Sequence, residues 1–271
     1  MLTKKISVVM PAYNEAAHIV SNLLETIETL TKYAPDFEVI VVDDGSPDET
    51  YREAAKLLSS QAGRVRIVQY DENQGKGNAL MCGAWFALGE LVVFMDADMD
   101  LHPAQLPVFF EIMERTGADI VIGSKRHRLS KVNYPRMRRI YSAIYYAMIR
   151  LMFGLPVKDT QTGLKVFKRE VLQRVFPRIL AKRFAFDIEV LANAHRLGFK
   201  MVDAPVTLEF QRRFGRIKWR DIVAVMTDTL AIFYRMYILK YYDRFDVERL
   251  NELPLSCEAR EVLEYDVVGR R

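Results

Sequence analysis

The chain has 271 residues, of which 50% are hydrophobic and 27% charged, and its formal net charge is +4. These values are ordinary for a globular protein and exclude a disordered or low-complexity chain. The small net charge and the lack of a recognition motif indicate that nucleic acid is not a partner. No run reaches the roughly 18 uncharged apolar residues of a membrane-spanning helix, because Arg150 interrupts the run from Ile140 and Asp228 the run from Ile222.

Strand and helix signals alternate through the first half of the chain. Short apolar runs rich in β-branched residues predict strands, and apolar residues at helical spacing between them predict helices. Strands separated by such helices indicate βαβ units, so the fold class is α/β with a mainly parallel central sheet. The strands are expected at Ile6–Met10, Glu38–Val42, Val65–Gln69, Leu91–Met95 and Asp119–Gly123, and the helices at Ala16–Lys32, from Ser46 as N-cap to about Ser59, at Gly77–Leu88 and at Pro103–Thr116.

The second half of the chain is richer in basic and aromatic residues. Helices are expected at Ile140–Phe153, Phe186–Leu197 and Asp221–Tyr242, a strand within Asp159–Phe167, and an extended segment at Met201–Phe210. The last helix is amphipathic, because Asp221, Asp228 and Arg235 form a polar line beside an apolar face. We therefore expect a main domain over residues 1–220, with an amphipathic helix and tail over residues 221–271 packed on it.

Acidic residues gather where two of the predicted strands end. Asp43 and Asp44 follow the second strand, and Asp96, Asp98 and Asp100 follow the fourth. The carboxyl ends of parallel strands share one edge of the sheet, which is where open α/β sheets bind ligands. Carboxylates there can accept hydrogen bonds from ribose hydroxyls or a base N–H. The alternative for the first pair is a simple Asp-Gly turn.

The run from Asp96 to Asp100 has a carboxylate at every second position. Alternate side chains of an extended chain point the same way, so three carboxylates would converge on one point. Like charges this close need a counter-charge, and hard oxygen ligands favour Mg²⁺ or Mn²⁺. The alternative is a solvated acidic loop that precedes the next helix.

Two further features have both a functional and a structural interpretation. The loop Gly75-Lys76-Gly77 could bring the backbone close to a phosphate at a helix N-terminus, although a lone GxG is more often a turn. The basic segments Lys125–Arg139 and Arg212–Arg220 adjoin amphipathic, aromatic helices, a pattern typical of helices that lie in a membrane interface. A solvated charged face beside core helices explains this second pattern equally well.

Four motifs, in this order along the chain, resemble those of family 2 of the inverting glycosyltransferases, which have the GT-A fold. They are Pro11-Ala12-Tyr13-Asn14-Glu15, Val42-Asp43-Asp44-Gly45-Ser46-Pro47-Asp48, Gly75-Lys76-Gly77-Asn78-Ala79 and Asp96-Ala97-Asp98. The resemblance covers roughly residues 5–220. Within the family, Gly123–Arg126, Asp159–Lys165 and Arg212–Arg216 look most similar to the dolichyl-phosphate mannose synthases and related polyprenyl-phosphate glycosyltransferases. The resemblance implies a Rossmann-like, nucleotide-sugar-binding GT-A domain with C-terminal amphipathic helices.

The resemblance also implies a role for each matching residue. The base and ribose of the donor would be held by Pro11, Tyr13, Glu15 and Asp43, with Asp44 and Lys76 in the same site. Asp96 would lie near the ribose or sugar, Asp159 would lie near the reacting sugar, and the metal would be bound by Asp98 and Asp100. The acceptor phosphate and the donor diphosphate would be contacted by Arg126, Arg139, Arg213 and Lys218. The catalytic set is then Asp96, Asp98, Arg126 and Asp159. At Asp100 the mannose synthases usually have Gln, so this chain carries an additional negative charge.

The implied reaction moves mannose or glucose from a GDP- or UDP-sugar to a polyprenyl or dolichyl phosphate, with Mg²⁺ or Mn²⁺. A phosphate acceptor is already anionic, so positioning and charge stabilisation matter more than a strong base. One alternative is a hydroxyl acceptor with Asp159 or Asp187 as general base. Another is a non-catalytic nucleotide-sugar-binding protein. We expect a peripheral protein at the cytoplasmic face of a membrane, and the sequence leaves a homo-oligomer open.

Overall fold

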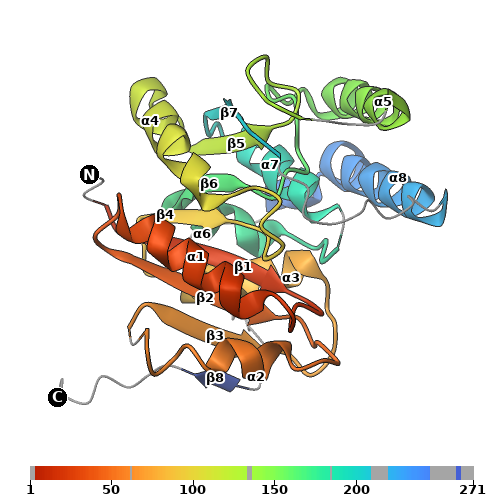
Figure 1. Ribbon diagram of the computed structural model, residues 1–271. Helices are drawn as coiled ribbons and strands as arrows, with labels where there is room; N and C mark the ends of the chain where they lie inside the picture. Colours follow the sequence, from red (N-terminus) through yellow and green to blue (C-terminus); the bar gives the residue numbers. More distant parts are fainter. Residues whose placement is uncertain are drawn as a thin grey trace.

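The structure, a computed structural model, describes residues 4–61, 63–132, 136–183, 185–208, 219–244 and 261–263, with the backbone alone at 136–141, 219–224 and 261–263. Its strands are β1 (Ile6–Ala12), β2 (Phe37–Asp43), β3 (Val65–Gln69), β4 (Leu91–Phe94), β5 (Ile120–Ser124), β6 (Lys165–Lys168), β7 (Met201–Pro205) and β8 (Glu261–Leu263). They form one eight-stranded sheet in the order β7-β5-β6-β4-β1-β2-β3-β8 (Figure 1).

The sheet is mainly parallel, as the sequence predicts. Strand β1 pairs in parallel with β2 and β4, β2 with β3, and β5 with β7. Strand β6 lies antiparallel between β4 and β5, and β8 lies antiparallel beside β3. Parallel strands are covered on both faces, which is why β1, β2 and β4 read as almost continuous apolar runs.

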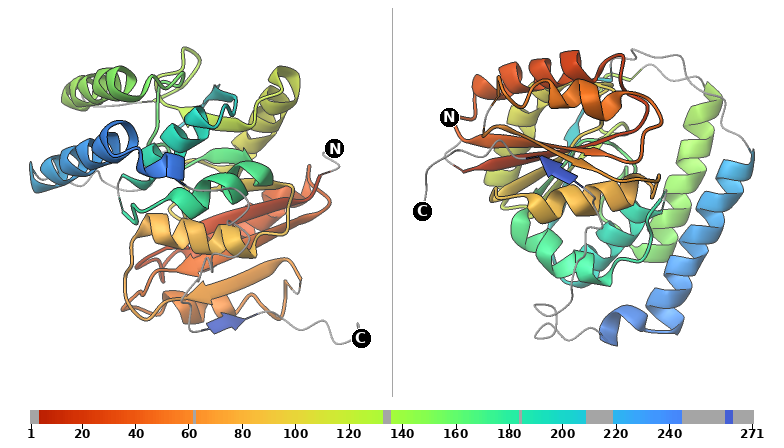
Figure 2. Two further views of the ribbon diagram at one scale, coloured as in Figure 1. Left: turned by 180° about the vertical axis from the view of Figure 1, so that it is seen from behind. Right: turned by 90° about the horizontal axis from the view of Figure 1, so that it is seen from below.

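Helices cover both faces of this sheet. They are α1 (Ile19–Thr31), α2 (Thr50–Ala55), α3 (Lys76–Phe86), α4 (Leu106–Thr116), α5 (Arg136–Phe153), α6 (Arg169–Val175), α7 (Phe186–Arg196) and α8 (Trp219–Phe233), with short turns η1 (Pro103–Gln105) and η2 (Phe176–Arg178). One core cluster contains side chains of α1, α2 and α4, and the other contains side chains of α3, α5, α6, α7 and α8. Figure 2 shows these two layers on either side of the strands.

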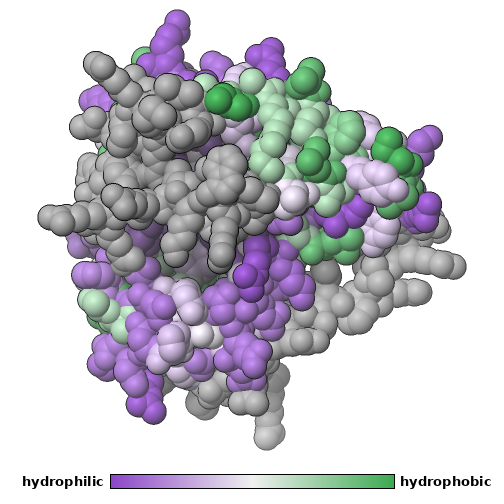
Figure 3. Space-filling view, turned by 90° about the vertical axis from the view of Figure 1, so that its right-hand side faces the viewer, coloured by the Kyte–Doolittle hydropathy of each residue, from purple (hydrophilic) through white to green (hydrophobic). Residues whose placement is uncertain are grey.

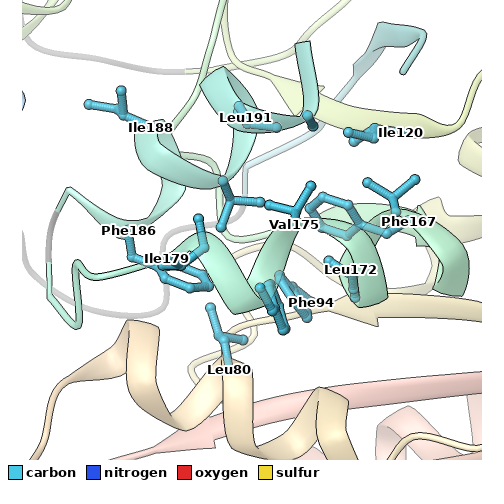
Figure 4. Close-up of a cluster of buried hydrophobic side chains, with 14 of the residues drawn as sticks. Leu80, Phe94, Ile120, Phe167, Leu172, Val175, Ile179, Phe186, Ile188 and Leu191 are labelled. Atoms are coloured by element: carbon cyan, nitrogen blue, oxygen red, sulfur yellow. The ribbon is translucent and has the colours of Figure 1, made fainter. Parts of the chain in front are cut away.

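The second cluster anchors α6 and α7 over the middle of the sheet (Figure 4). The ring centroids of Phe94 on β4 and Phe167 on β6 are 4.9 Å apart. Phe186, the first residue of α7, and Val175 of α6 are buried in the same cluster with Leu80 of α3. This packing holds the N-terminus of α7 close to the N-terminal part of α3.

Helices α5 and α8 lie side by side (Figures 1 and 2). Ile149 and Phe153 of α5 and Ile232 of α8 are buried in the common core. The sequence predicts one α-helix over Asp221–Tyr242, but the α-helix ends at Phe233 and continues as a π-helix, η3 (Tyr234–Ile238), followed by a 3₁₀ turn, η4 (Tyr241–Arg244). No helix within the described ranges is long and apolar enough to cross a membrane.

The structure corrects three further details of the predicted elements. Helix α2 begins at Thr50, so Ser46 is not its N-cap. Helix α6 and strand β8 were not predicted, because α6 has seven residues and β8 has three, and such short elements carry too little periodicity to identify.

Candidate functional site

The loops that follow β1 and β2 are joined by hydrogen bonds at the carboxyl edge of the sheet. The N–H of Asn14 donates to Ser46 Oγ (3.0 Å), and the N–H of Glu15 donates to Thr50 Oγ1 (2.8 Å). The N–H of Ala16 donates to Asp48 Oδ2 (3.2 Å). The two loops are therefore held together by Ser46, Asp48 and Thr50. Tyr13 lies on the first loop with its side chain exposed.

Asp43 is fully buried at the end of β2, where its carboxylate links three segments. Its Oδ1 accepts hydrogen bonds from the N–H (3.2 Å) and the hydroxyl of Ser46, and its Oδ2 accepts one from Gln69 Nε2 (3.2 Å). Burial raises the pKa of Asp43, although these hydrogen bonds oppose the shift. Pro11 pairs with Val42 in the adjacent strand. The residues of β1 and β2 that were predicted to bind the nucleotide-sugar donor therefore do lie together.

Asp44 orders the glycine-containing loop ahead of α3. Its carboxylate accepts hydrogen bonds from the N–H groups of Gln74 (2.8 Å) and Gly75 (2.9 Å). Gly75 has φ +100°, and a Cβ there would lie 2.6 Å from the carbonyl oxygen of Lys182. The loop is therefore held against the protein by a buried carboxylate, and its glycine is required by close backbone packing.

This loop presents Lys76 to Asp96. The Lys76 ammonium forms an ion pair with Asp96 Oδ1, and the two side chains are 46% and 34% exposed, so a ligand can reach the pair. Burial raises the pKa of Asp96, but Lys76 and then Lys165 and Lys125 lower it more, so the carboxylate is ionised. Burial lowers the pKa of Lys76, but Asp96 and Asp187 raise it more, so the ammonium is charged.

The chain turns after Asp96 instead of remaining extended. Met99 has φ +60°, and Asp98 Oδ1 accepts a hydrogen bond from the N–H of Asp100 (3.1 Å). In the part of the chain that the structure describes, no group of three acidic, histidine or cysteine side chains is placed to hold a metal ion. The prediction that three carboxylates converge is therefore wrong, because Asp96 points to Lys76.

Asp98 and Asp100 still fit a divalent cation that is completed by substrate oxygens. Burial, then the charges of Asp96 and Asp100, raise the pKa of Asp98 to about 6, and the N–H of Asp100 and the charge of Lys76 oppose this shift only in part. A bound cation would stabilise the ionised form further. Mg²⁺ is commonly bound by one or two carboxylates together with substrate phosphates. Two carboxylates at the end of β4 are sufficient for a site of that kind.

A second ion pair, which is largely buried, lies next to Lys76 and Asp96. Lys165 on β6 has a side chain that is only 3% exposed, and its Nζ is 2.8 Å from Asp187 Oδ1 at the start of α7. An anionic side chain is favourable at a helix N-terminus. Lys165 was not among the predicted site residues. The sequence does carry a signal for it, because a lysine within the apolar run Leu164–Phe167 is expected to be buried. A buried cation needs an anionic partner.

Of the remaining predicted site residues, the structure describes the side chains of Asp159 and Arg126 only. Asp159 accepts hydrogen bonds from the N–H groups of Lys125 (3.2 Å) and Gln161 (3.2 Å), so it joins the end of β5 to the loop before β6. The guanidinium of Arg126 lies 4.8 Å from the ring centre of Tyr146 on α5. Arg139 lies on α5, where only the backbone is described, and Arg213 and Lys218 lie outside the described residues.

Comparison with known proteins gives a consistent result. The family model described as Glycosyl transferase family 2 matches residues 7–176. The chain is 31% identical to glycosyltransferase AglD of Haloferax volcanii over 86% of its own length and 38% of that protein. It is 31% identical to dolichyl-phosphate beta-glucosyltransferase ALG5A of Trichomonas vaginalis over 88% of its own length and 76% of that protein.

A solved structure has the same fold. Glucosyl-3-phosphoglycerate synthase from Mycobacterium tuberculosis, in complex with Mn²⁺, UDP-glucose and phosphoglyceric acid, superposes with a TM-score of 0.64. The two sequences are 23% identical, and the match covers 90% of this chain and 82% of the synthase. The predicted GT-A fold is confirmed.

Proposed function

Because the chain belongs to glycosyl transferase family 2, we propose that it transfers a hexose from a nucleotide-sugar donor to a polyprenyl or dolichyl phosphate. The observation that carries this proposal is the partly exposed Lys76–Asp96 pair beside Asp98, at the sheet edge where the loops after β1, β2 and β4 meet. The names of the relatives support glucose over mannose. The solved neighbour supports UDP-glucose as the first donor to test.

In the proposed reaction the side chains of the protein mainly bind the donor and place charged groups around the reacting phosphates. The nucleoside end of the donor site is lined by Pro11, Tyr13, Glu15 and Asp43. Lys76 orients Asp96 near the ribose or the sugar. Asp98 and Asp100 would hold Mg²⁺ or Mn²⁺, which would supply positive charge to balance the diphosphate leaving group. The acceptor phosphate oxygen forms the new bond to the anomeric carbon while the bond to the diphosphate oxygen breaks, so no proton must be removed.

A hydroxyl acceptor would need a general base, and the geometry of the two candidates argues against one. Both carboxylate oxygens of Asp159 accept backbone hydrogen bonds. Asp187 is paired with the buried ammonium of Lys165. Both carboxylates are therefore engaged by the protein's own donors, and neither is presented to an acceptor hydroxyl. A phosphate acceptor needs neither Asp159 nor Asp187 as a general base.

The test is a panel of UDP- and GDP-sugars incubated with polyprenyl phosphate and Mn²⁺, with the product identified by mass spectrometry. We expect a hexosyl-phosphoryl-polyprenol from UDP-glucose, and nucleoside diphosphate released in equal amount. Release of nucleoside diphosphate without a lipid product would favour a different acceptor. If neither product forms while the nucleotide binds, the non-catalytic alternative is correct.

We also propose that the protein docks peripherally on the cytoplasmic face of a membrane, where a lipid-linked acceptor is found. Apolar side chains gather over α5 and α8 (Figure 3). Ile144 and Leu151 on α5, and Leu230, Tyr234 and Ile238 on α8 and η3, are exposed. Large apolar patches on a surface mark sites of interaction. A homo-oligomeric contact at the same surface is the competing interpretation.

Leu151→Glu and Ile238→Glu should each weaken binding to anionic liposomes at low salt. Burying such a side chain contributes about 1.5–3 kcal/mol, so each change should reduce binding about tenfold or more. Co-sedimentation measures the bound fraction, and sedimentation velocity measures the oligomeric state. Leu88→Glu, at an exposed position after α3, is the matched control and should bind like the wild type. Unchanged liposome binding together with a shift from dimer to monomer would support the oligomeric interpretation.

Gly163→Ala should reduce catalytic efficiency through Asp96. A Cβ on Gly163 would overlap the carboxylate of Asp96 and push it away from Lys76. Displacing a positioned group by about 1 Å can cost up to roughly 100-fold in rate, so we expect a loss between tenfold and that value in steady-state assays. The control is Gly154→Ala, where φ is +66° but no atom lies within 4 Å; it should lower the melting temperature and leave kcat/KM unchanged.

A further inference from the structure

Glu189 on α7 is a fully buried carboxylate that the proposed reaction does not use. Its Oε2 accepts hydrogen bonds from the N–H groups of Leu180 (2.9 Å) and Ala181 (2.6 Å). Its Oε1 accepts from the hydroxyl of Tyr242 and from Arg235 Nη2 (3.2 Å). A buried charge is tolerated when it is paired and fully hydrogen-bonded. Glu189 therefore joins two segments that are far apart in the sequence.

The first segment is Tyr234–Arg244, which directly follows α8. Arg235 lies on the π-helix η3 and Tyr242 on η4, and Arg235 Nε donates a hydrogen bond to the hydroxyl of Tyr242 (3.1 Å). The π-helical turn changes the direction of side chains relative to a regular α-helix, and such turns occur frequently at functional sites. A second contact, Arg196 Nη2 to Asp243 Oδ1 (2.5 Å), fastens the same stretch to α7.

The second segment is the loop between η2 and α7, which contacts the start of α3. The N–H of Asn78 donates to the carbonyl oxygen of Lys182 (3.2 Å). A Cβ on Gly77 would lie 2.5 Å from the Cβ of Phe186 and 2.9 Å from the same carbonyl oxygen, so the two segments are in close contact. Lys76, whose ammonium pairs with Asp96, immediately precedes Gly77.

We propose that Glu189 is a positioning residue that couples the docking of Tyr234–Arg244 to the placement of Lys76 against Asp96. The path runs from Tyr242 and Arg235 through Glu189 to the loop at 180–182, and then to the N-terminus of α3. Each step is a hydrogen bond or a direct packing contact. The consequence for turnover rests on the proposed function, whereas the physical coupling does not.

Hydrogen exchange tests the coupling without any substrate. Tyr242→Phe removes one hydroxyl and retains the ring, and Arg235→Met removes the cation. Both should accelerate amide exchange at residues 75–78 by roughly 2- to 30-fold, the range of coupling that single substitutions modulate. The control is Lys168→Met, which breaks an ion pair between β6 and Asp119 (2.7 Å), the residue before β5, and should leave exchange at residues 75–78 unchanged. Faster exchange at 180–181 and 234–244 with unchanged exchange at 75–78 would overturn the proposal.

A double-mutant cycle tests the consequence for the reaction. With UDP-glucose, Mn²⁺ and polyprenyl phosphate, Arg235→Met should lower kcat/KM in the wild-type background and have little further effect when Lys76→Met is present. Additive effects would mean that Glu189 only stabilises the fold, and would overturn the positioning role. If the wild type transfers no glucose but the exchange result holds, then the proposed function fails and the coupling stands.

Discussion

Asp98→Asn is expected to raise the melting temperature at pH 8 in the presence of a chelator, and to abolish most of the turnover. Burial and the neighbouring charges of Asp96 and Asp100 raise the pKa of Asp98 to about 6. A carboxyl group with a higher pKa in the folded than in the unfolded chain binds protons more readily when folded, so stability falls as the pH rises from about 4 through about 6. An amide at the same position does not ionise and avoids this loss.

The pH and metal dependence make this prediction specific. The gain in melting temperature should be largest at pH 8 and should nearly vanish near pH 4. Adding Mn²⁺ and UDP should stabilise the wild type much more than the variant, because the variant keeps only the Asp100 carboxylate of the two proposed metal ligands. Turnover should fall by at least about 100-fold, as is typical when a charge-stabilising group is removed. Differential scanning fluorimetry and steady-state assays measure the two effects.

Asp119→Asn is the matched control for Asp98→Asn. Burial raises the pKa of Asp119, but its contacts with Lys168 and Lys200 lower it more, so its ionised form stabilises the fold at pH 8 and this contribution is lost as the pH falls. This variant should therefore lose stability at pH 8 and keep its response to Mn²⁺ and UDP. An Asp98→Asn variant that retains wild-type turnover would remove Asp98 from the site.

The first half of the fold could be predicted because its signals are local. Buried parallel strands read as apolar runs, and the helices between them have apolar residues at helical spacing. The strand order could not be predicted in the same way. Strand β6 inserts antiparallel between β4 and β5, and that placement depends on contacts such as Phe94 with Phe167, 73 positions apart in the chain.

The sequence predicted where the candidate site lies, but it did not predict the contacts that its carboxylates make. The carboxyl ends of β2 and β4 do carry Asp43, Asp44, Asp96 and Asp98 as expected. The partners of these carboxylates depend on tertiary structure, because Asp44 binds the loop before α3 and Asp96 binds Lys76. The run after β4 was predicted to be extended, and the positive φ of Met99 gave no signal in the sequence, since a non-glycine residue rarely adopts it.

Glu189 shows a different limit of sequence reasoning. It lies two positions after Asp187 in the first turns of α7, where an acidic residue reads as a solvated helix start. Its burial follows from the docking of η3 and η4 onto α7, and the sequence predicts a regular helix there. Its four hydrogen-bond donors come from two segments that only the folded chain brings together.

Lys76→Met should reduce turnover by about 100-fold, comparable to the loss of a charge-stabilising donor, and should also shift the pH dependence of the reaction. Lys76 is the main group that holds the pKa of Asp96 low against the effect of burial. Without the ammonium, the pKa of Asp96 rises, and Asp96 becomes protonated at a higher pH than in the wild type. The acid limb of the profile of kcat/KM against pH should therefore move to higher pH.

Two substitutions separate this effect from a general loss of positive charge. Lys76→Arg retains the cation and should keep the acid limb near its wild-type position, even if the larger head group lowers the rate. Lys182→Met removes an exposed lysine whose carbonyl oxygen, and not its ammonium, contacts α3; it should leave both the rate and the pH profile unchanged. An acid limb that stays in place in Lys76→Met would mean that the ionisation of Asp96 does not limit the reaction.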